Sequence, residues 1–238
     1  YVWGRAFRTL SGPIPGTYTL ETLLRSGTFT VSWFVEQISG IRAGDLNLGL
    51  SAEQILEAAA SRLPPGAEGL VALPYWAGAQ TPYWDAEARG VIIGWSGHHT
   101  KAHIFRAILE GIAFEQRLNT EGVEAALGQP VHHFLAMGGG SRSSLWCQII
   151  ADVTHRPVSV CKSVETTCLG AAILAAAAIG WFRDIREAAA AMASVRERYE
   201  PNESRAIIYD ALYTGVYREL YTRLAPLFPK LSAVQKGA

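Results

Sequence analysis

The chain has 238 residues, 49% of them hydrophobic, and its 21 basic and 21 acidic side chains give a formal net charge of zero. This composition is typical of a globular protein with a substantial core, and the lack of a basic run argues against nucleic acid as a partner. The longest uncharged run, 166–182, is too short and too rich in alanine and glycine to span a membrane, and the first residues lack the layout of a signal peptide. We therefore expect a cytoplasmic protein that contacts neither a membrane nor a nucleic acid.

The beginning of the chain predicts short strands and then a helix. Residues 1–19 are rich in glycine, proline and threonine, which favours short strands joined by loops. Ser26, Gly27 and Thr28 precede apolar residues spaced as on one face of a helix, and Gly40 ends that helix. This helix start is either a simple capping turn or a place where glycine and hydroxyl groups meet a ligand.

A second helix and two short strands follow. The pattern Ser-Ala-Glu-Gln at 51–54 is a capping box, and Pro-Pro-Gly at 64–66 closes the helix that it opens. Short strands are predicted at 69–73 and 90–94. The loop between them, 74–85, is dense in aromatic residues, and it either packs over an edge of the core or forms a wall of a cleft.

A long helix is predicted to begin after Thr100, because apolar residues recur every four positions along it. Arg106 and Glu110 are four positions apart and are expected to face each other. Gly111 costs about 1 kcal/mol of helix propensity relative to alanine, so its presence predicts close packing against another backbone. We expect the helix to fray near 122–128.

A strand, a glycine turn and a helix follow in direct succession. The apolar run 133–137 predicts a buried strand, three glycines occupy 138–140, and a helix is expected to start at Ser141 or Ser143 and to reach Val153. Such an arrangement can present backbone N–H groups to a ligand, and glycine lets the ligand approach without a Cβ in the way. The spacing matches neither the dinucleotide fingerprint nor the P-loop, so this motif alone is equally compatible with a tight turn without a ligand.

The rest of the chain predicts one strand and three helices. A strand at 157–161 precedes a helix that Thr166 or Thr167 caps. An alanine-rich helix is expected over 184–195, and a long amphipathic helix over 203–224. The order of strands and helices after residue 129 favours an α/β fold, and no repeat or linker divides the chain into more than one domain.

The last long helix carries a stripe of tyrosines, Tyr213, Tyr217 and Tyr221, which we interpret as packing and not as a ligand site. Pro226 and Pro229 are expected to end the ordered part of the chain.

Cysteine and histidine residues give no pattern typical of a metal site. Cys147, Cys161 and Cys168 form no C-x-x-C pair and lie among apolar residues, which predicts buried free thiols in a reducing compartment. His99 and His103 lie four apart, but no acid or cysteine completes a zinc pattern around them. We expect a solvated start of the long helix there and no bound metal.

Several segments, taken together and in order, resemble the C-terminal domain of the FGGY family of carbohydrate kinases, which includes xylulokinase, ribulokinase, gluconate kinase and glycerol kinase. The resemblance lies in Ser26-Gly27-Thr28 with 33–34, in 73–78, 81–85, 88–90 with Gly94, and 106–114. It continues in Gly138-Gly139-Gly140-Ser141-Arg142-Ser143 with Trp146, Gln148, Ile149 and 151–152, and ends in Glu165, 169–175 and Gly180. One such motif would be weak support, but these cover nearly the whole chain.

The resemblance implies the C-terminal domain of an actin-like ATPase fold (ribonuclease-H-like), in which two such domains flank a cleft. In that family the C-terminal domain supplies most of the adenosine site. By this analogy Gly138, Gly139 and Gly140 lie against the adenine and ribose, and Ser143 makes a polar contact with the nucleotide.

The other side of the implied nucleotide site is the helix start at Gly27 and Thr28, with Ser32 one turn further on. Glycerol kinase has glutamine where this chain has Ser32, so this contact differs from that relative. The segment 169–172 resembles the one that packs at the interdomain hinge of the family, where small residues let helices slide as the cleft closes.

The resemblance also implies that the catalytic parts of the enzyme lie outside this chain. The family's catalytic aspartate and its phosphate loop are expected to precede Tyr1, together with an N-terminal sugar-binding domain. We therefore expect no catalytic residue and no metal ligand in this chain, and no turnover by the chain alone. The missing N-terminal domain is its expected partner, and a homodimer stays open.

The whole protein is expected to transfer the γ-phosphate of ATP, with Mg²⁺, to a hydroxyl of a sugar or polyol. The turn Gly-Gly-Gly-Ser at 138–141 is more like that of the pentulose kinases than the Asp-Gly-Gly-Ala-like turn of glycerol kinase, which favours a ketopentose such as xylulose.

Two alternatives stay open beside a sugar kinase. An actin- or Hsp70-like nucleotide-binding module would keep the fold without the transfer, although the motifs at 81–85 and 106–114 argue against it. A non-catalytic scaffold domain would bind only a protein partner.

Overall fold

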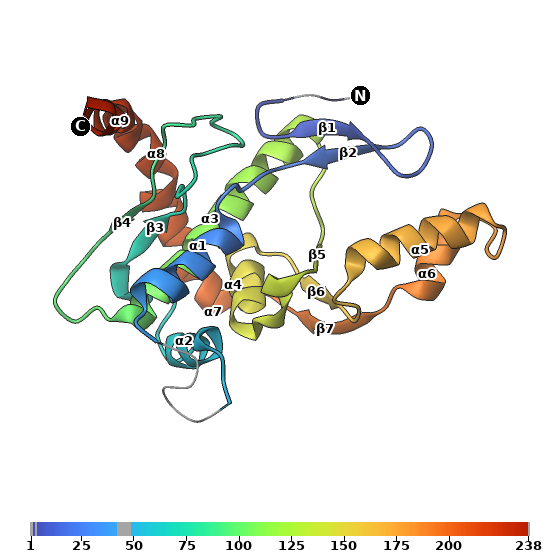
Figure 1. Ribbon diagram of the computed structural model, residues 1–238, viewed down its shortest axis with the longest axis horizontal. Helices are drawn as coiled ribbons and strands as arrows, with labels where there is room; N and C mark the ends of the chain where they lie inside the picture. Colours follow the sequence, from blue (N-terminus) through green and yellow to red (C-terminus); the bar gives the residue numbers. More distant parts are fainter. Residues whose placement is uncertain (1, 3, 42–48, 238) are drawn as a thin grey trace.

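The computed structural model describes residues 2, 4–41 and 49–237 (Figure 1). The limits of the predicted domain, Tyr1 and Ala238, lie outside the described residues. The strands are β1 (Arg8–Ser11), β2 (Tyr18–Glu21), β3 (Val71–Leu73), β4 (Val91–Ile93), β5 (Phe134–Ala136), β6 (Val158–Cys161) and β7 (Val195–Tyr199). The α-helices are α1 (Gly27–Trp33), α2 (Ala52–Ala60), α3 (Lys101–Leu127), α4 (Ser144–Thr154), α5 (Thr166–Ala178), α6 (Ile185–Met192), α7 (Glu203–Leu212), α8 (Arg218–Leu224) and α9 (Phe228–Gly237).

Shorter helical turns extend or connect these elements. Two are π-helical and three are 3₁₀-helical, and they span Phe34–Ile38, Tyr213–Tyr217, Ala67–Gly69, Gly139–Arg142 and Ala225–Leu227.

The described strands form three small sheets. β1 pairs antiparallel with β2, and β3 pairs antiparallel with β4. The third sheet has the order β5-β6-β7, in which β6 is parallel to β5 and antiparallel to β7. The parallel pair β5 and β6 is joined by α4, so the predicted strand–helix–strand unit of an α/β fold is confirmed at this place.

The long helix α3 runs through the middle of the molecule, where it packs against α2, α4 and β3 (Figure 1). Gly111 lies in close contact with β3, because a Cβ placed there would lie 2.3 Å from the carbonyl oxygen of Ala72. The prediction of close packing at Gly111 is thus confirmed. The glycine brings the helix within contact of a strand whose residues are all buried.

A buried ion pair joins three helices at the centre of the core. Nε of Arg106 lies 2.7 Å from Oε1 of Glu110, as their four-residue spacing predicts, and both side chains are almost completely buried. Arg106 also donates to the carbonyl oxygen of Ala60 and to the hydroxyl of Tyr209. The pair therefore connects α3 to α2 and to α7.

The tyrosines of the C-terminal helices pack on α3 and also make hydrogen bonds that the sequence pattern does not reveal. The rings of Tyr213 and Tyr217 pack against Phe114, with centroids 6.0 and 5.1 Å away. Each hydroxyl donates to a carboxylate: Tyr209 to Glu110, Tyr213 to Glu121, Tyr217 to Glu115 and Tyr221 to Asp85.

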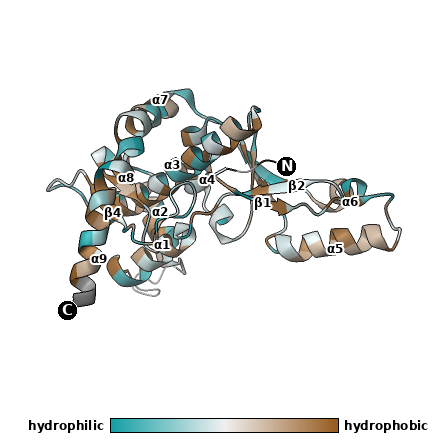
Figure 2. Ribbon diagram, turned by 90° about the horizontal axis from the view of Figure 1, so that it is seen from above, coloured by the Kyte–Doolittle hydropathy of each residue, from teal (hydrophilic) through white to brown (hydrophobic). Residues whose placement is uncertain are grey.

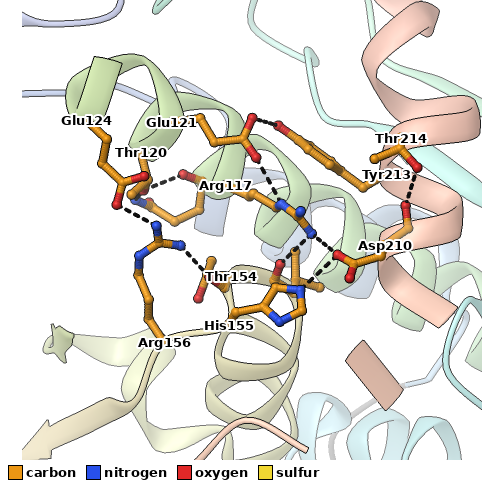
Figure 3. A network of polar contacts seen from close by, with 12 residues as sticks. Arg117, Thr120, Glu121, Glu124, Thr154, His155, Arg156, Asp210, Tyr213 and Thr214 are labelled. Atoms are coloured by element: carbon orange, nitrogen blue, oxygen red, sulfur yellow. Dashed lines mark hydrogen bonds and ion pairs between the residues drawn. The ribbon is translucent and has the colours of Figure 1, made fainter. Parts of the chain in front are cut away.

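A polar network ties the C-terminal half of α3 to α7 and to the end of α4 (Figure 3). Arg117 lies at its centre, where its Nη1 donates to Oδ1 of Asp210 at 2.5 Å and its guanidinium lies 4.2 Å from the ring centre of Tyr213. His155, in the left-handed conformation that ends α4, places Nε2 2.8 Å from the same Asp210 oxygen. One carboxylate of α7 thus contacts both α3 and the turn before β6.

The pair α5 and α6 projects from the body of the molecule, and α5 is largely apolar (Figures 1 and 2). Only Ile173 and Ala176 of α5 are buried. Leu174 and, just after the helix, Ile179 and Trp181 are 42%, 63% and 76% exposed. A helix that is apolar around most of its circumference is normally covered on more than one face.

Three predictions about the ends of elements were wrong. The helix expected over 184–195 ends at Met192, and the residues after it form β7, an edge strand antiparallel to β6. Pro226 and Pro229 do not end the ordered chain: Pro226 lies in the first turn of a 3₁₀ helix, and Pro229 is the second residue of α9. Proline is tolerated there because the first residues of a helix need no N–H donor.

Helix α3 does not fray at Gly122 but continues to Leu127 and ends at Gly128 in the left-handed conformation. Gly122 instead marks a close contact, since a Cβ there would lie 2.4 Å from the Cβ of Ala6.

Three predictions about burial and capping were also wrong. The strand β5 is partly exposed, with Leu135 at 45%, although its sequence is apolar. Cys147 and Cys161 are buried free thiols as predicted, whereas Cys168 is exposed on α5. The residue that precedes α5 as its N-cap is Glu165, and neither of the two threonines takes that role.

Candidate functional site

A cavity of about 630 Å³ opens where α1, α2 and α3 meet the start of α4. It is lined by Thr28, Val31, Ser32, Ser51, Glu53, Gln54, Glu57, Phe105, Leu109, Gly139, Gly140, Arg142, Ser143 and Trp146. Five of the seven residues predicted for the nucleotide site are among them, namely Thr28, Ser32, Gly139, Gly140 and Ser143. Segments more than a hundred residues apart in sequence therefore meet around one space.

The glycine turn between β5 and α4 forms one wall of the cavity. Gly138 has φ 77° and ψ −170°, a conformation that side-chain-bearing residues rarely adopt, and it turns the chain out of β5 without lining the cavity itself. Around Gly139 no atom of the described residues lies within 4 Å of an added Cβ, so the backbone there borders open space. At Gly140 an added Cβ would lie 2.8 Å from Cζ3 of Trp146, so this glycine lets the turn pack on the indole.

Ser143 is the N-cap of α4, because its side-chain oxygen accepts the backbone N–H of Trp146 at 3.1 Å. Its hydroxyl also donates to Oε1 of Glu57 at 2.9 Å. The same Glu57 oxygen accepts the backbone N–H of Leu145 at 3.0 Å. A carboxylate from α2 thus binds the N-terminus of α4, where the helix dipole favours negative charge.

The facing wall is the start of α1. Thr28 and Ser32 lie one turn apart on it and both line the cavity, whereas Gly27 begins the helix and lies outside the lining. Ser26 fixes this start, since its hydroxyl oxygen accepts the backbone N–H of Ala77 at 2.8 Å. The loop after β3 therefore holds α1 in place opposite the glycine turn.

The lining separates into an apolar and a polar part. Phe105, Leu109 and Trp146 are buried, and together with Val31 they form the apolar part of the cavity wall. Six polar side chains stand around it besides Thr28 and Ser32, and they are Ser51, Glu53, Gln54, Glu57, Arg142 and Ser143. A flat apolar ligand portion with a polar extension fits such a lining.

The residues that α2 and α3 contribute were not predicted as site residues. Ser51 and Gln54 were recognised only as a capping box, which the structure confirms by hydrogen bonds of 2.8 and 3.2 Å. Phe105 and Leu109 follow the helical period of α3 and look like ordinary core residues in the sequence. No local signal distinguishes Glu57 from a solvent-exposed helix residue.

The histidines near the start of α3 surround Glu68. His98 and His103 place Nε2 3.0 and 3.2 Å from its Oε2. Nδ1 of His103 accepts the backbone N–H of Thr100, which turns Nε2 toward Glu68. His103 is buried and not solvated as predicted. Among the described residues no group of three or more His, Cys, Asp or Glu side chains has the arrangement of a metal site.

Cys147 follows Trp146 on α4, and burial raises the pKa of its thiol to about 11. A thiol with this pKa is a poor nucleophile at neutral pH. Separately, none of the helices in the described ranges is both long and apolar enough to cross a membrane.

Comparison with known proteins gives one consistent result. Residues 4–179 match the model of the FGGY family of carbohydrate kinases, C-terminal domain. The chain is 34% identical over 221 residues to a xylulose kinase of Staphylococcus epidermidis, a match that covers 93% of this chain and 42% of the relative. It therefore spans about two fifths of the length of this curated relative.

Solved structures agree with this match. The crystal structure of xylulose kinase from Rhodospirillum rubrum superimposes with a TM-score of 0.75 at 31% identity, and ligand-bound xylulose kinase from Lactobacillus acidophilus with a TM-score of 0.77 at 28% identity. Each match covers 90% of this chain and 41% of the other. The predicted fold, the C-terminal domain of an actin-like ATPase, is confirmed, and the chain belongs to the FGGY family of carbohydrate kinases.

Proposed function

We propose that this chain is the nucleotide-binding domain of a kinase that transfers the γ-phosphate of ATP, with Mg²⁺, to a hydroxyl of a sugar or polyol. The observation that carries the proposal is the cavity in which Thr28 and Ser32 of α1 face Gly139, Gly140 and Ser143 of the glycine turn. Its volume of about 630 Å³ lies within the range of ordinary ligand pockets.

The lining supports an adenosine in this cavity. The apolar residues Phe105, Leu109 and Trp146 suit the faces of a flat base, and the exposed backbone at Gly139 allows the nucleotide to approach closely. In this assignment Gly138 shapes the turn and Gly27 opens α1, so both act on the nucleotide through their neighbours. When bound, ATP with Mg²⁺ supplies the phosphoryl group, while this chain binds and orients the adenosine.

Calorimetric titration of ADP into the chain tests the proposal. We expect saturable binding of one ADP per chain, and a failure to bind at millimolar ADP, also in a longer protein that includes the N-terminal domain, would favour the scaffold alternative. An actin-like module that binds nucleotide without transferring phosphate would pass this test, so turnover has to be measured as well.

The acceptor that we propose is a ketopentose such as xylulose, since the relatives reported above are named xylulose kinases. A coupled ADP-release assay on the full-length kinase, with xylulose, ribulose, gluconate and glycerol offered in turn, should give the highest kcat/KM with xylulose. The family's catalytic aspartate is expected outside this chain, so we expect no sugar-dependent ATP consumption by the chain alone. Robust turnover by the chain alone would contradict the assignment of roles.

The exposed apolar surface of α5 fits a domain interface of this kinase, located in the cytoplasm. Leu174, Ile179 and Trp181 are the large apolar side chains on this surface, and we propose that the N-terminal domain covers them. Amide hydrogen exchange over 166–181 should be slower in the full-length kinase than in the isolated chain. Equal exchange in both would contradict this interface.

A further inference from the structure

Glu57 occupies a special position in the cavity because it joins two of its walls. It belongs to α2, yet it binds Ser143 and Leu145 at the start of α4, at 2.9 and 3.0 Å. These two bonds orient the carboxylate, because a side chain held by two donors from another helix keeps one rotamer. Both bonds end on Oε1, and no donor of the described residues bonds to Oε2, which leaves its lone pairs for a ligand.

We propose that Glu57 is the residue that recognises the ribose of the nucleotide, by accepting a hydrogen bond from its 2′- or 3′-hydroxyl. This inference rests on the proposed nucleotide-binding function and deepens it. Glu57 is half-buried and lines the cavity, so a ligand that displaces water from it has to supply a hydrogen-bond donor to Oε2 or leave the carboxylate poorly satisfied.

The chemistry of the nucleotide leaves few candidate donors. The phosphates carry only acceptors and negative charge, so they are repelled by Glu57 and by Glu53 on the same helix. Base and phosphates are joined by the ribose, whose two hydroxyls are donors. The apolar part of the cavity wall, formed by Phe105, Leu109 and Trp146, suits the base. With the base there, the ribose lies toward the polar side chains of α2 and α4.

Binding of 2′-deoxy-ADP and 3′-deoxy-ADP, measured beside ADP, tests the assignment. We expect at least one deoxy analogue to bind the unmodified chain about tenfold more weakly than ADP, the size of one hydrogen bond to a charged group. In Glu57→Gln the amide oxygen can still accept from Ser143 and Leu145, while an NH₂ group replaces the free acceptor. The preference for ADP should then fall to about twofold or less.

Glu53→Gln is the matched control, because Glu53 lines the cavity from the same helix but is not bound to α4. It should retain the full preference for ADP over the deoxy analogues. A purely structural role of Glu57 would weaken all three nucleotides equally in Glu57→Gln and leave their ratio unchanged. This ratio therefore separates recognition from positioning, and thermal melting of each variant verifies that it is folded.

Each of the remaining outcomes contradicts a different part of the proposal. If the unmodified chain binds ADP and both deoxy analogues equally, or if Glu57→Gln keeps the preference, ribose recognition by Glu57 is wrong and the nucleotide site stands. Loss of discrimination between ADP and IDP in Glu57→Gln, with the ribose preference intact, would assign the carboxylate to the 6-amino group of the base. If none of the nucleotides binds, the proposed function fails and this assignment fails with it.

Discussion

The hydroxyl of Tyr217 donates a 2.6 Å hydrogen bond to Oε2 of Glu115, a carboxyl group that α3 carries into the core. Tyr75 donates to the same group from the loop after β3, at 3.0 Å to each oxygen. Both tyrosines and Glu115 are buried. Burial raises the pKa of Glu115 from 4.5 to about 7, and the hydrogen bonds from Tyr217 and Tyr75 only partly offset this shift.

The raised pKa of Glu115 predicts a stability that falls as the pH rises. Between about pH 4.5 and 7 the folded chain holds a proton on Glu115 that the unfolded chain has lost, so the free energy of unfolding decreases through this window. Glu115→Gln removes this titration. As the pH rises from about 5 to 8, we expect the free energy of unfolding of the variant to increase by up to about 3 kcal/mol relative to that of the unmodified chain. Urea unfolding of both proteins at the two pH values measures this gain.

Glu121→Gln is the matched control for this experiment. Glu121 also accepts a tyrosine hydroxyl, from Tyr213, but its side chain is 36% exposed and lies beside Arg117. This variant should keep the pH dependence of the unmodified chain, because Glu115 is intact. An equal pH dependence of the unmodified chain and of Glu115→Gln would contradict the role assigned to Glu115.

Features that depend on local sequence were predictable, and those that depend on distant partners were not. The capping box at 51–54 and the close contact at Gly111 follow from the residues themselves, because each reflects a local cost or bond. The strand β7 was missed because Arg196, Glu197 and Arg198 occupy its centre, and the exposed residues of an edge strand need no apolar alternation.

The candidate site shows the same limit. The glycine turn and Ser143 were predicted as site residues through the resemblance to the FGGY kinases, because glycines before a helix start are by themselves equally compatible with a turn without a ligand. Glu57 could not be identified, since its role arises only where α2 meets α4 in space. Phe105 and Leu109 have the period of core residues, and only the cavity next to them distinguishes these two.

The buried pair of Arg106 and Glu110 predicts strong coupling between two substitutions. Arg106→Met should destabilise the chain by about 3–5 kcal/mol, because it leaves the Glu110 carboxylate buried without its cation. Adding Glu110→Leu removes that carboxylate, so the double variant should lose clearly less than the sum of the two single losses. Urea unfolding of the four proteins completes the cycle, and additive losses would mean that the ion pair contributes no coupling.

Replacing two helical glycines by alanine should change the stability of the chain in opposite directions. Gly111→Ala places a Cβ 2.3 Å from the carbonyl oxygen of Ala72, and we expect a loss of about 1–3 kcal/mol despite the better helix propensity. Gly170→Ala, inside α5, meets no atom of the described chain within 4 Å and should gain about 0.5–1 kcal/mol. Thermal melting should show a lower melting temperature for Gly111→Ala and a higher one for Gly170→Ala than for the unmodified chain. A stabilised Gly111→Ala would contradict the close approach of α3 and β3.

The backbone of Gly139 offers the most direct way to close the nucleotide cavity without disturbing the fold. A side chain added there meets no described atom within 4 Å, and the residue lines the cavity, so we expect the side chain in Gly139→Val to take up space that the ligand would occupy. We expect ADP binding to weaken at least about tenfold, the equivalent of about 1.4 kcal/mol, at an unchanged melting temperature. Gly97→Val is the control, since its Cβ also meets no atom within 4 Å but Gly97 lies outside the cavity lining. Calorimetric titration should give normal ADP affinity for this control, and equal affinities of the two variants would move the nucleotide away from the glycine turn.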